Sequence, residues 1–295
     1  MRIDHLLAKA TAQLSSSDTA RLDAELLLAH VLDKPRSYFF TWPEKEVSAP
    51  YDHQFEHLIH QRQQGIPIAY LIGEKEFWSL RLKVNEATLI PRPDTEHLVE
   101  LALACPLPEP HKANVADLGT GTGAIALALA HEQPNWQVYA IEKSQQALAV
   151  AKENAQLNHI NNVSFLEGSW CEPLRREAAA LDMIVSNPPY IPAKDQHLQQ
   201  GDVRFEPLSA LASGADGLGD IRLIIKQSAP LLKPGGWLLL EHGYDQGVLV
   251  RTLFTRMGFC QIRTESDLSD HERVSLGRKP GRLTGNSPPT TVAEN

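Results

Sequence analysis

The chain has 295 residues, 42% of them hydrophobic, and a formal net charge of −8, which allows one large domain and a small one with a substantial core. The acidic charge argues against binding of nucleic acid through its phosphates, and the isolated cysteines disfavour disulfides and a zinc site. The first residues mix charges with apolar positions, unlike a signal peptide, and no apolar run could span a membrane. We therefore expect a cytoplasmic protein that needs no metal and contacts neither a membrane nor, directly, nucleic acid.

Residues 1–75 have apolar positions at helical spacing and predict a small helical domain. Its third helix is expected over residues 51–64. Over residues 76–90 the period changes to that of a short hairpin or extended bridge, which would link the helical domain to the rest of the chain. Either Asp94 or Thr95 is expected to cap the helix that follows.

Between residues 91 and 280 apolar strands alternate with helical segments, which is typical of a doubly wound parallel sheet. The last two strands are joined by a link too short for a parallel crossover, so they should pair antiparallel. The sequence thus predicts an α/β fold: a mostly parallel, seven-stranded Rossmann-like sheet with an antiparallel last strand, preceded by the helical domain. The strands are expected at 114–118, 137–141, 163–167, 181–186, 236–242, 259–264 and 272–277. Residues 281–295 lack apolar periodicity and are expected to be a disordered tail.

A glycine-rich loop joins the first of these strands to a helix. Glycine lets the backbone turn tightly and lets a ligand approach without interference from Cβ. Glu142 ends the next strand, where a carboxylate can accept hydrogen bonds from both ribose hydroxyls of an adenosine. The pattern predicts a nucleoside cofactor rather than a purely structural turn, but its GxGxG spacing does not identify that cofactor. The loop consists of Gly119, Thr120, Gly121, Thr122 and Gly123.

A second loop, with the sequence NPPY, follows the buried strand 181–186 and should face the glycine loop, because ligands bind at the carboxyl ends of parallel strands. The side-chain oxygen of Asn187 and the carbonyl of Pro188 are two acceptors that can hold both hydrogens of one NH₂ group. Pro188 and Pro189 fix the backbone, and Tyr190 offers a flat face for a planar amide or base. An NH₂ group held in this way is oriented for in-line attack on an activated methyl group. The loop therefore predicts methyl transfer to an amide or amine nitrogen, the alternative being a proline-stiffened turn.

With both loops in view, the sequence resembles the release-factor glutamine methyltransferase family. The resemblance implies transfer of a methyl group from S-adenosylmethionine to the side-chain amide nitrogen (N5) of the glutamine in the GGQ motif of class-1 peptide-chain release factors. It also implies that residues 1–75 help to dock the release factor. The matching segments are LIPRPDTE (89–96), DLGTGTGAIALALA (117–130), IVSNPPYI (184–191), QQGDVRFEPLSAL (199–211), GGWLLLEHGYDQG (235–247) and ERVSLGR (272–278).

The same resemblance implies roles for individual residues. The glycine loop and Glu142 would hold S-adenosylmethionine, and Trp170 would pack near its adenine. The loop from Asn187 to Tyr190 would hold the glutamine, with Asn187 also touching the methionine end of the cofactor. The chain departs from the commonest family pattern at Glu142, where aspartate is frequent, although the longer carboxylate can serve the same hydroxyls.

Other functions remain open at this point. An adenine-N6 methyltransferase would share the NPPY loop but should carry a basic target-recognition region. A glutamine methyltransferase for a ribosomal protein cannot be separated by the loop, and the glycine loop alone would also suit a nicotinamide-dependent oxidoreductase. Residues 191–219 exceed an ordinary connection and are either a lid over the substrate or a surface excursion. Glu241 ends a strand near the crevice and is given no catalytic role.

Overall fold

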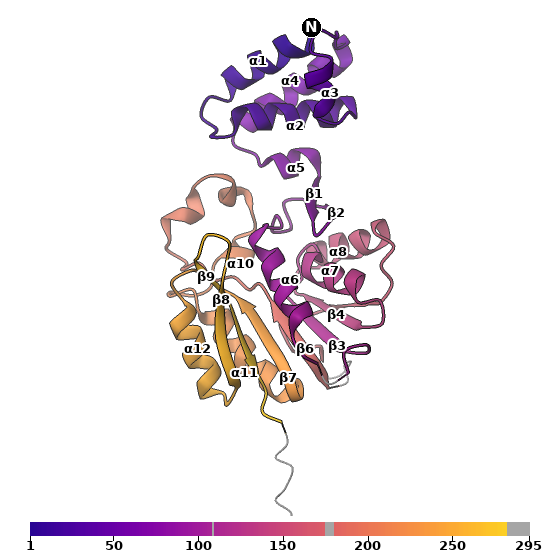
Figure 1. The fold of residues 1–295 in the computed structure, drawn as a ribbon. Coiled ribbons are helices and arrows are strands. Elements are labelled where there is room, and N and C mark those ends of the chain that lie inside the picture. The colour runs from indigo at the N-terminus through magenta and orange to yellow at the C-terminus, as the bar shows by residue number, and fades with distance from the viewer. Residues whose placement is uncertain (108, 175–179, 282–295) are drawn as a thin grey trace, which may run out of the picture.

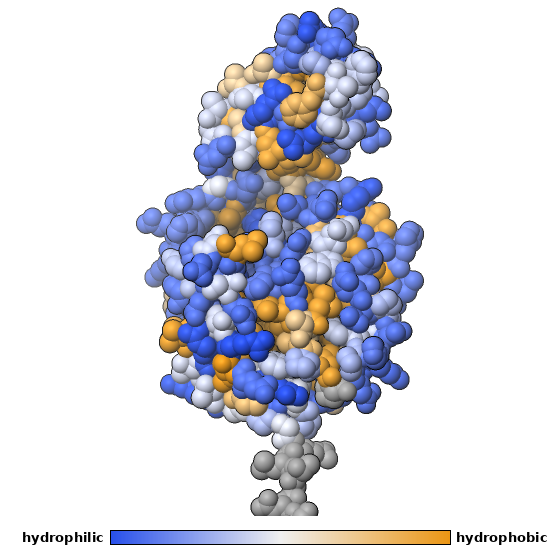
Figure 2. All heavy atoms as spheres, in the orientation of Figure 1, coloured by the Kyte–Doolittle hydropathy of each residue, from blue (hydrophilic) through white to orange (hydrophobic). Residues whose placement is uncertain are grey.

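The computed structural model describes residues 1–107, 109–174 and 180–281, which form a helical part stacked on a larger part built around a sheet (Figure 1). The helical part has a hydrophobic core of its own, to which the first, second and fourth helices contribute their apolar stripes. Polar residues cover much of the face drawn in Figure 2. The helices are α1 (Ile3–Gln13), α2 (Ala20–Leu32), α3 (Ser37–Thr41), α4 (Ala49–Gln63) and α5 (Ile68–Ile72).

A hairpin follows α5 and starts two residues before the predicted range. Its strands β1 (Glu74–Phe77) and β2 (Leu80–Lys83) pair antiparallel. The two turn residues, Trp78 and Ser79, have φ angles of 53° and 60°, a backbone twist that suits a two-residue hairpin loop. The apolar side chains of the hairpin are buried in the core of the sheet-containing part, so the hairpin is anchored there.

The main sheet has seven strands in the order β5-β4-β3-β6-β7-β9-β8. The pairs from β5 to β7 are parallel, whereas β9 is antiparallel to both of its neighbours. The predicted α/β fold with an antiparallel last strand is confirmed. The strands are β3 (Asn114–Leu118), β4 (Gln137–Glu142), β5 (Val163–Glu167), β6 (Leu181–Ser186), β7 (Leu232–Glu241), β8 (Cys260–Ser266) and β9 (Glu272–Arg278).

Helices cover both faces of this sheet, and each face has its own hydrophobic core. On one face lie α6 (Asp94–Ala104), α7 (Ala124–Glu132) and α8 (Gln145–Leu157). On the other lie α11 (Gly219–Leu231) and α12 (Gly247–Arg256). The connection between β6 and α11 contains the short helices η1 (Gln196–Gln199), η2 (Asp202–Phe205) and α10 (Leu208–Leu211).

The predicted cap of α6 is wrong. Pro93 is the residue at the cap position, and the side chains of Asp94 and Thr95 lie in the first helical turn without capping it. The Thr95 hydroxyl points instead to the end of β7, where it meets a buried carboxylate. Within the described ranges, no helix is both long and apolar enough to cross a membrane. The predicted tail, 281–295, lies outside the described residues apart from residue 281.

Candidate functional site

The carboxyl ends of the central strands bring the candidate residues together. The glycine loop follows β3, Glu142 ends β4, the NPPY loop follows β6 and Glu241 ends β7. These four strands are consecutive in the sheet order β4-β3-β6-β7, so the two predicted loops lie on neighbouring strands. Ligands of open α/β sheets bind at this end of the strands, and this strand-end region is called the crevice below.

The glycine loop depends on left-handed backbone conformations at its first and last positions. Gly119 has a φ of 74°, and a Cβ atom there would lie 3.1 Å from Trp170 Cζ3. Gly123 has a φ of 85° and directly precedes α7, and a Cβ atom there would lie 3.1 Å from Leu127. A side chain at either position would strain the backbone and crowd a neighbour. The loop therefore keeps a bare backbone on which a ligand can lie.

The buried side chain of Asn154 holds this loop to the rest of the molecule. Its Nδ2 donates to the carbonyl of Thr122 over 2.9 Å and to the carbonyl of Lys83 over 3.1 Å, while its Oδ1 accepts from the Lys83 amide over 2.7 Å. One side chain of α8 thus connects the glycine loop to the hairpin. The contact fixes the position of the loop relative to the linker that leads to the helical part.

Glu142 is half-buried and faces the glycine loop. Its Oε2 accepts the Gly121 amide hydrogen over 3.0 Å, and its Oε1 accepts the Ser144 amide hydrogen over 2.9 Å. Each carboxylate oxygen has a second lone pair, so two further donors can bind. The predicted role of this residue, which is to accept hydrogen bonds from the two hydroxyls of a ribose, stays a prediction.

Asp117, which the sequence analysis did not single out as a functional residue, lies fully buried at the end of β3. Its Oδ2 accepts from the Thr120 hydroxyl over 2.6 Å and from the Ala126 amide over 3.1 Å. Its Oδ1 is buried without a hydrogen-bond partner. Burial raises the pKa of this carboxyl to about 7, although both donors act in the opposite direction. A cationic ligand at the glycine loop, such as the ammonium and sulfonium groups of S-adenosylmethionine, would favour the ionised form.

Trp170 lies against the glycine loop, where its ring meets the position of Gly119. Its indole Nε1 donates to Asp220 Oδ1 over 3.2 Å, which holds the ring between the loop and α11. Its φ of 48° is unusual for a bulky residue and reflects the tight chain path after β5. A flat ring at this place suits a contact with an adenine, which is the role that the resemblance implies.

The NPPY loop is held by a buried network. Asn187 Nδ2 donates to Thr95 Oγ1 over 3.0 Å, and Thr95 Oγ1 donates to Glu241 Oε2 over 2.8 Å. The Tyr190 hydroxyl donates to Glu241 Oε1 over 3.4 Å. Among the described residues, neither Asn187 Oδ1 nor the Pro188 carbonyl oxygen has a hydrogen-bond partner. Two acceptors of this loop are therefore left for a substrate.

Burial dominates the titration of this network. It raises the pKa of Glu241 to about 7, against the lowering effects of the Thr95 hydrogen bond and the Arg273 charge. Burial and the neighbouring Glu241 charge also raise the pKa of Tyr190, so its hydroxyl stays protonated and remains a donor.

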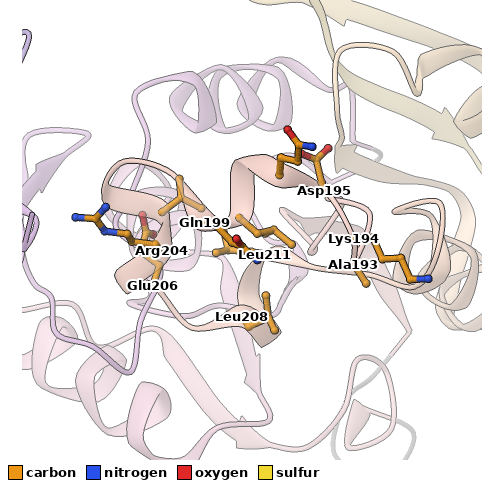
Figure 3. A pocket seen from close by; sticks show the side chains of 11 residues that line it. Ala193, Lys194, Asp195, Gln199, Arg204, Glu206, Leu208 and Leu211 are labelled. Atoms are coloured by element: carbon orange, nitrogen blue, oxygen red, sulfur yellow. The ribbon is translucent and has the colours of Figure 1, made fainter.

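The connection 191–219 lines a pocket of about 400 Å³, in which Leu208 and Leu211 lie between Lys194 and Arg204 at opposite ends (Figure 3). Glu206, also in its wall, accepts the Ile90 amide hydrogen over 3.0 Å. The same carboxylate forms an ion pair with Arg92. These contacts fasten the connection to the segment that precedes α6.

Contacts of the same connection also reach the helical part. Arg62 of α4 forms ion pairs with Asp202 and with Asp23 of α2. Arg204 donates to the carbonyl of Gln64 over 3.2 Å. The connection therefore joins the crevice to the helical part, and neither the lid nor the surface excursion predicted from the sequence describes it fully.

Sequence reasoning assigned no functional role to Asp117, Glu241 or Thr95, although the first two had a signal. Asp117 lies two residues before the first glycine of the loop. Glu241 follows Leu240, which pairs with Ser186, so the register of β6 and β7 places Glu241 beside Asn187. Thr95 had no such signal, because its helical position also suited a cap.

Comparisons with known proteins identify relatives of this chain and of its fold. Residues 5–73 match the PrmC N-terminal domain family and residues 100–204 match the methyltransferase small domain family. A release factor glutamine methyltransferase from Vibrio cholerae is 52% identical over 94% of this chain and 96% of its own length. A release factor glutamine methyltransferase from Escherichia coli K12 is 49% identical over 94% of this chain and 99% of its own length. A solved methyltransferase from Pyrococcus furiosus, 16% identical over 68% of this chain and 89% of its own, has a TM-score of 0.51 and shares the fold.

Proposed function

This chain belongs to the release factor glutamine methyltransferase family, and we propose that its substrate is the glutamine of the GGQ motif in class-1 peptide-chain release factors. The methyl group would be transferred from S-adenosylmethionine to N5 of that side chain. The observation that carries the proposal is the pair of unengaged acceptors in the NPPY loop, one strand away from a glycine loop built for a nucleoside.

S-adenosylmethionine is the methyl donor, and it supplies a methyl group on a positively charged sulfur. Glu142 has the free lone pairs to accept both ribose hydroxyls, and the bare backbone of Gly119 and Gly121 allows close approach. Asp117 provides negative charge below the loop, where the cationic part of the donor would lie. Trp170 provides the flat surface for the adenine.

The residues of the NPPY loop orient the substrate nitrogen. Asn187 Oδ1 and the Pro188 carbonyl each accept one hydrogen of the glutamine NH₂ group, which directs the nitrogen lone pair to the methyl carbon. The new carbon–nitrogen bond forms as the sulfur–carbon bond breaks, with the electron pair returning to sulfur. The methylated nitrogen then carries a positive charge and releases one proton to water, which makes the methylated amide neutral. Because such a cation is a strong acid, no dedicated base is required.

The helical part is proposed to dock the release factor. It has its own core and joins the larger part through α5 and the hairpin. Phe40 is 66% exposed and Tyr51 is 48% exposed, and large exposed aromatics are typical of protein interfaces. Docking on the helical part would select the protein substrate, whereas the NPPY loop selects the NH₂ group.

The direct test is methylation by the purified protein with radiolabelled methyl donor. We expect labelling of a class-1 release factor and none of a variant in which the GGQ glutamine is replaced by alanine. A ribosomal protein and double-stranded DNA are the competing substrates. Labelling of either in preference to the release factor would contradict the proposal.

A further inference from the structure

A chain of hydrogen bonds links the two polar side chains of the NPPY loop to one buried carboxylate. Asn187 reaches Glu241 through the hydroxyl of Thr95, and Tyr190 reaches the other oxygen of Glu241 directly. The participants come from the loop after β6, the first turn of α6 and the end of β7. Three elements that are far apart in the sequence therefore converge on the Asn187 amide.

The direction of these hydrogen bonds follows from the carboxylate. An ionised carboxylate accepts hydrogen bonds and cannot donate one. The Thr95 hydroxyl has a single hydrogen, so once it donates to Glu241 it can only accept from Asn187. Asn187 must then turn its NH₂ group toward Thr95, and its oxygen is left for a donor in the crevice.

Stability alone does not account for Glu241. Glu241 is 2% exposed, and none of the ion pairs among the described residues includes it. Arg273, whose charge acts on Glu241, is paired with Asp267 over 3.1 Å. A buried carboxylate held only by two hydroxyl groups costs free energy that a well-packed apolar side chain would not. Its presence at this strand end points to a role in the site.

We propose that Thr95 and Glu241 are positioning residues that set the polarity of the Asn187 amide, so that its oxygen faces the NH₂ group of the substrate. The inference rests on the proposed function, because an oxygen is needed at this place only if the substrate donates a hydrogen to Asn187. With the amide reversed, two NH₂ groups would face each other and one of the two substrate contacts would be lost. Glu241 thus acts through Thr95 and does not itself touch the reacting atoms.

Three variants separate the hydroxyl from the shape of the side chain. Thr95→Val keeps the shape and removes the hydroxyl, whereas Thr95→Ser keeps the hydroxyl. Thr88→Val is the matched control, since Thr88 is equally buried but its hydroxyl bonds only within the turn that begins at Asn85. Each variant is compared with the wild type in single-turnover methylation of the release factor at saturating S-adenosylmethionine. The affinity for S-adenosylhomocysteine and the melting temperature are measured in parallel.

We expect Thr95→Val to slow methyl transfer by about 10- to 100-fold, as the loss of a positioning contact does, and Thr95→Ser to restore most of the rate. Thr88→Val should transfer at the wild-type rate, and all variants should bind S-adenosylhomocysteine alike. Wild-type transfer by Thr95→Val would overturn the inference. So would a loss that serine does not rescue, or a loss that follows cofactor affinity or melting temperature. Failure of the proposed function would look different, because the wild type would then leave the release factor unlabelled.

Discussion

Arg62 and Asp202, which are 140 residues apart in the sequence, form an ion pair with 2.8 Å between Nη1 and Oδ1. The same guanidinium contacts Asp23 Oδ2 over 2.9 Å, and the Arg62 side chain is only 13% exposed. Because Asp202 lies in the connection that follows the NPPY loop, this arginine ties the helical part to that connection. The orientation of the proposed docking domain therefore depends on a small, partly buried cluster of charges.

Loss of this ion pair should lower kcat/KM for the protein substrate and leave the affinity for the cofactor unchanged. Arg62→Met keeps most of the apolar stem, and Asp23 keeps its hydrogen bonds from Ser17 and Thr19. We expect kcat/KM for the intact release factor to fall roughly 5- to 50-fold, corresponding to about 1–2 kcal/mol, the size of coupling between contacting charged residues. Isothermal titration with S-adenosylhomocysteine should show an unchanged Kd.

The control for Arg62 is Arg81→Met. Arg81 pairs with Glu74 over 2.8 Å on the exposed hairpin, and exposed ion pairs contribute little. If the two arginine variants have the same kcat/KM, the contact between α4 and the connection has no part in substrate use.

Glu142 should act on cofactor binding more than on the rate of methyl transfer. Glu142→Ala removes the acceptors proposed for two ribose hydroxyls and also releases the Gly121 amide. We expect binding of S-adenosylhomocysteine to weaken by about 2–4 kcal/mol, with less effect on the rate at saturating cofactor. Glu167→Ala is a matched control, because Glu167 ends the neighbouring strand in register with Glu142 and is exposed. Equal Kd values for the two variants would remove Glu142 from the cofactor site.

The fold and the two loops could be predicted because their signals are local. Alternating strands and helices predicted the sheet, and the glycine and NPPY sequences each occupy a few consecutive residues after a buried strand. The contact between Thr95 and Glu241 spans 146 residues and arises only when α6 packs beside β7. Thr95 was predicted as a cap because Ser, Thr and Asp favour that position, but a tertiary partner took its hydroxyl. The link between Arg62 and Asp202 is of the same kind, since single charged residues carry no pattern.

Asp117 should make the ligand-free protein less stable as the pH rises. Its pKa is about 7 in the folded protein and near 3.8 when unfolded, so the folded state holds more protons between these values. The free energy of unfolding must then fall as the pH rises from 4 to 7. We expect Asp117→Asn to reduce this fall by roughly 2–4 kcal/mol, as measured by urea unfolding at several pH values. Glu241 contributes with the same sign, so part of the decrease in the free energy of unfolding with pH should persist. If the decrease in Asp117→Asn equals that of the wild type, Asp117 does not cause it.

Glu241 gives the reaction itself an expected pH dependence. Its pKa is raised to about 7, and the groups that act on it are the hydroxyls of Thr95 and Tyr190 and the charges of Asp94 and Arg273. Below pH 7 the carboxyl becomes protonated and can donate to Thr95, which allows the Asn187 amide to reverse.

The single-turnover rate should therefore fall as the pH drops from 8 to 6, approaching tenfold per pH unit at the acid end. Glu241→Gln carries no titrating group and should give a flat profile over the same range. An identical acid limb in this variant would assign the titration to another group, and the profile is best recorded at saturating S-adenosylmethionine.

The proposal that an amide nitrogen is the target depends on Asn187, so replacing this residue is the strictest test of the proposal. Asn187→Ala removes the acceptor for the substrate NH₂, and we expect the single-turnover rate to fall by about 10²-fold or more. Asn187→Asp keeps an acceptor but adds a negative charge close to Glu241 and cannot donate to Thr95, so it should also be slow. The melting temperature should change little in the alanine variant, because Asn187 is only half-buried at the edge of the crevice.

Cofactor binding by the alanine variant should weaken modestly if Asn187 also touches the methionine end, so every rate is measured at saturating S-adenosylmethionine. Under that condition a reduced rate does not arise from incomplete occupancy of the cofactor site. Near-normal transfer by Asn187→Ala would show that the Pro188 carbonyl and the rest of the loop orient the nitrogen without the side chain. Orientation of the Asn187 amide by Thr95 and Glu241 would then have no effect on the reaction. The geometric reason for expecting an NH₂ group as the target would be lost.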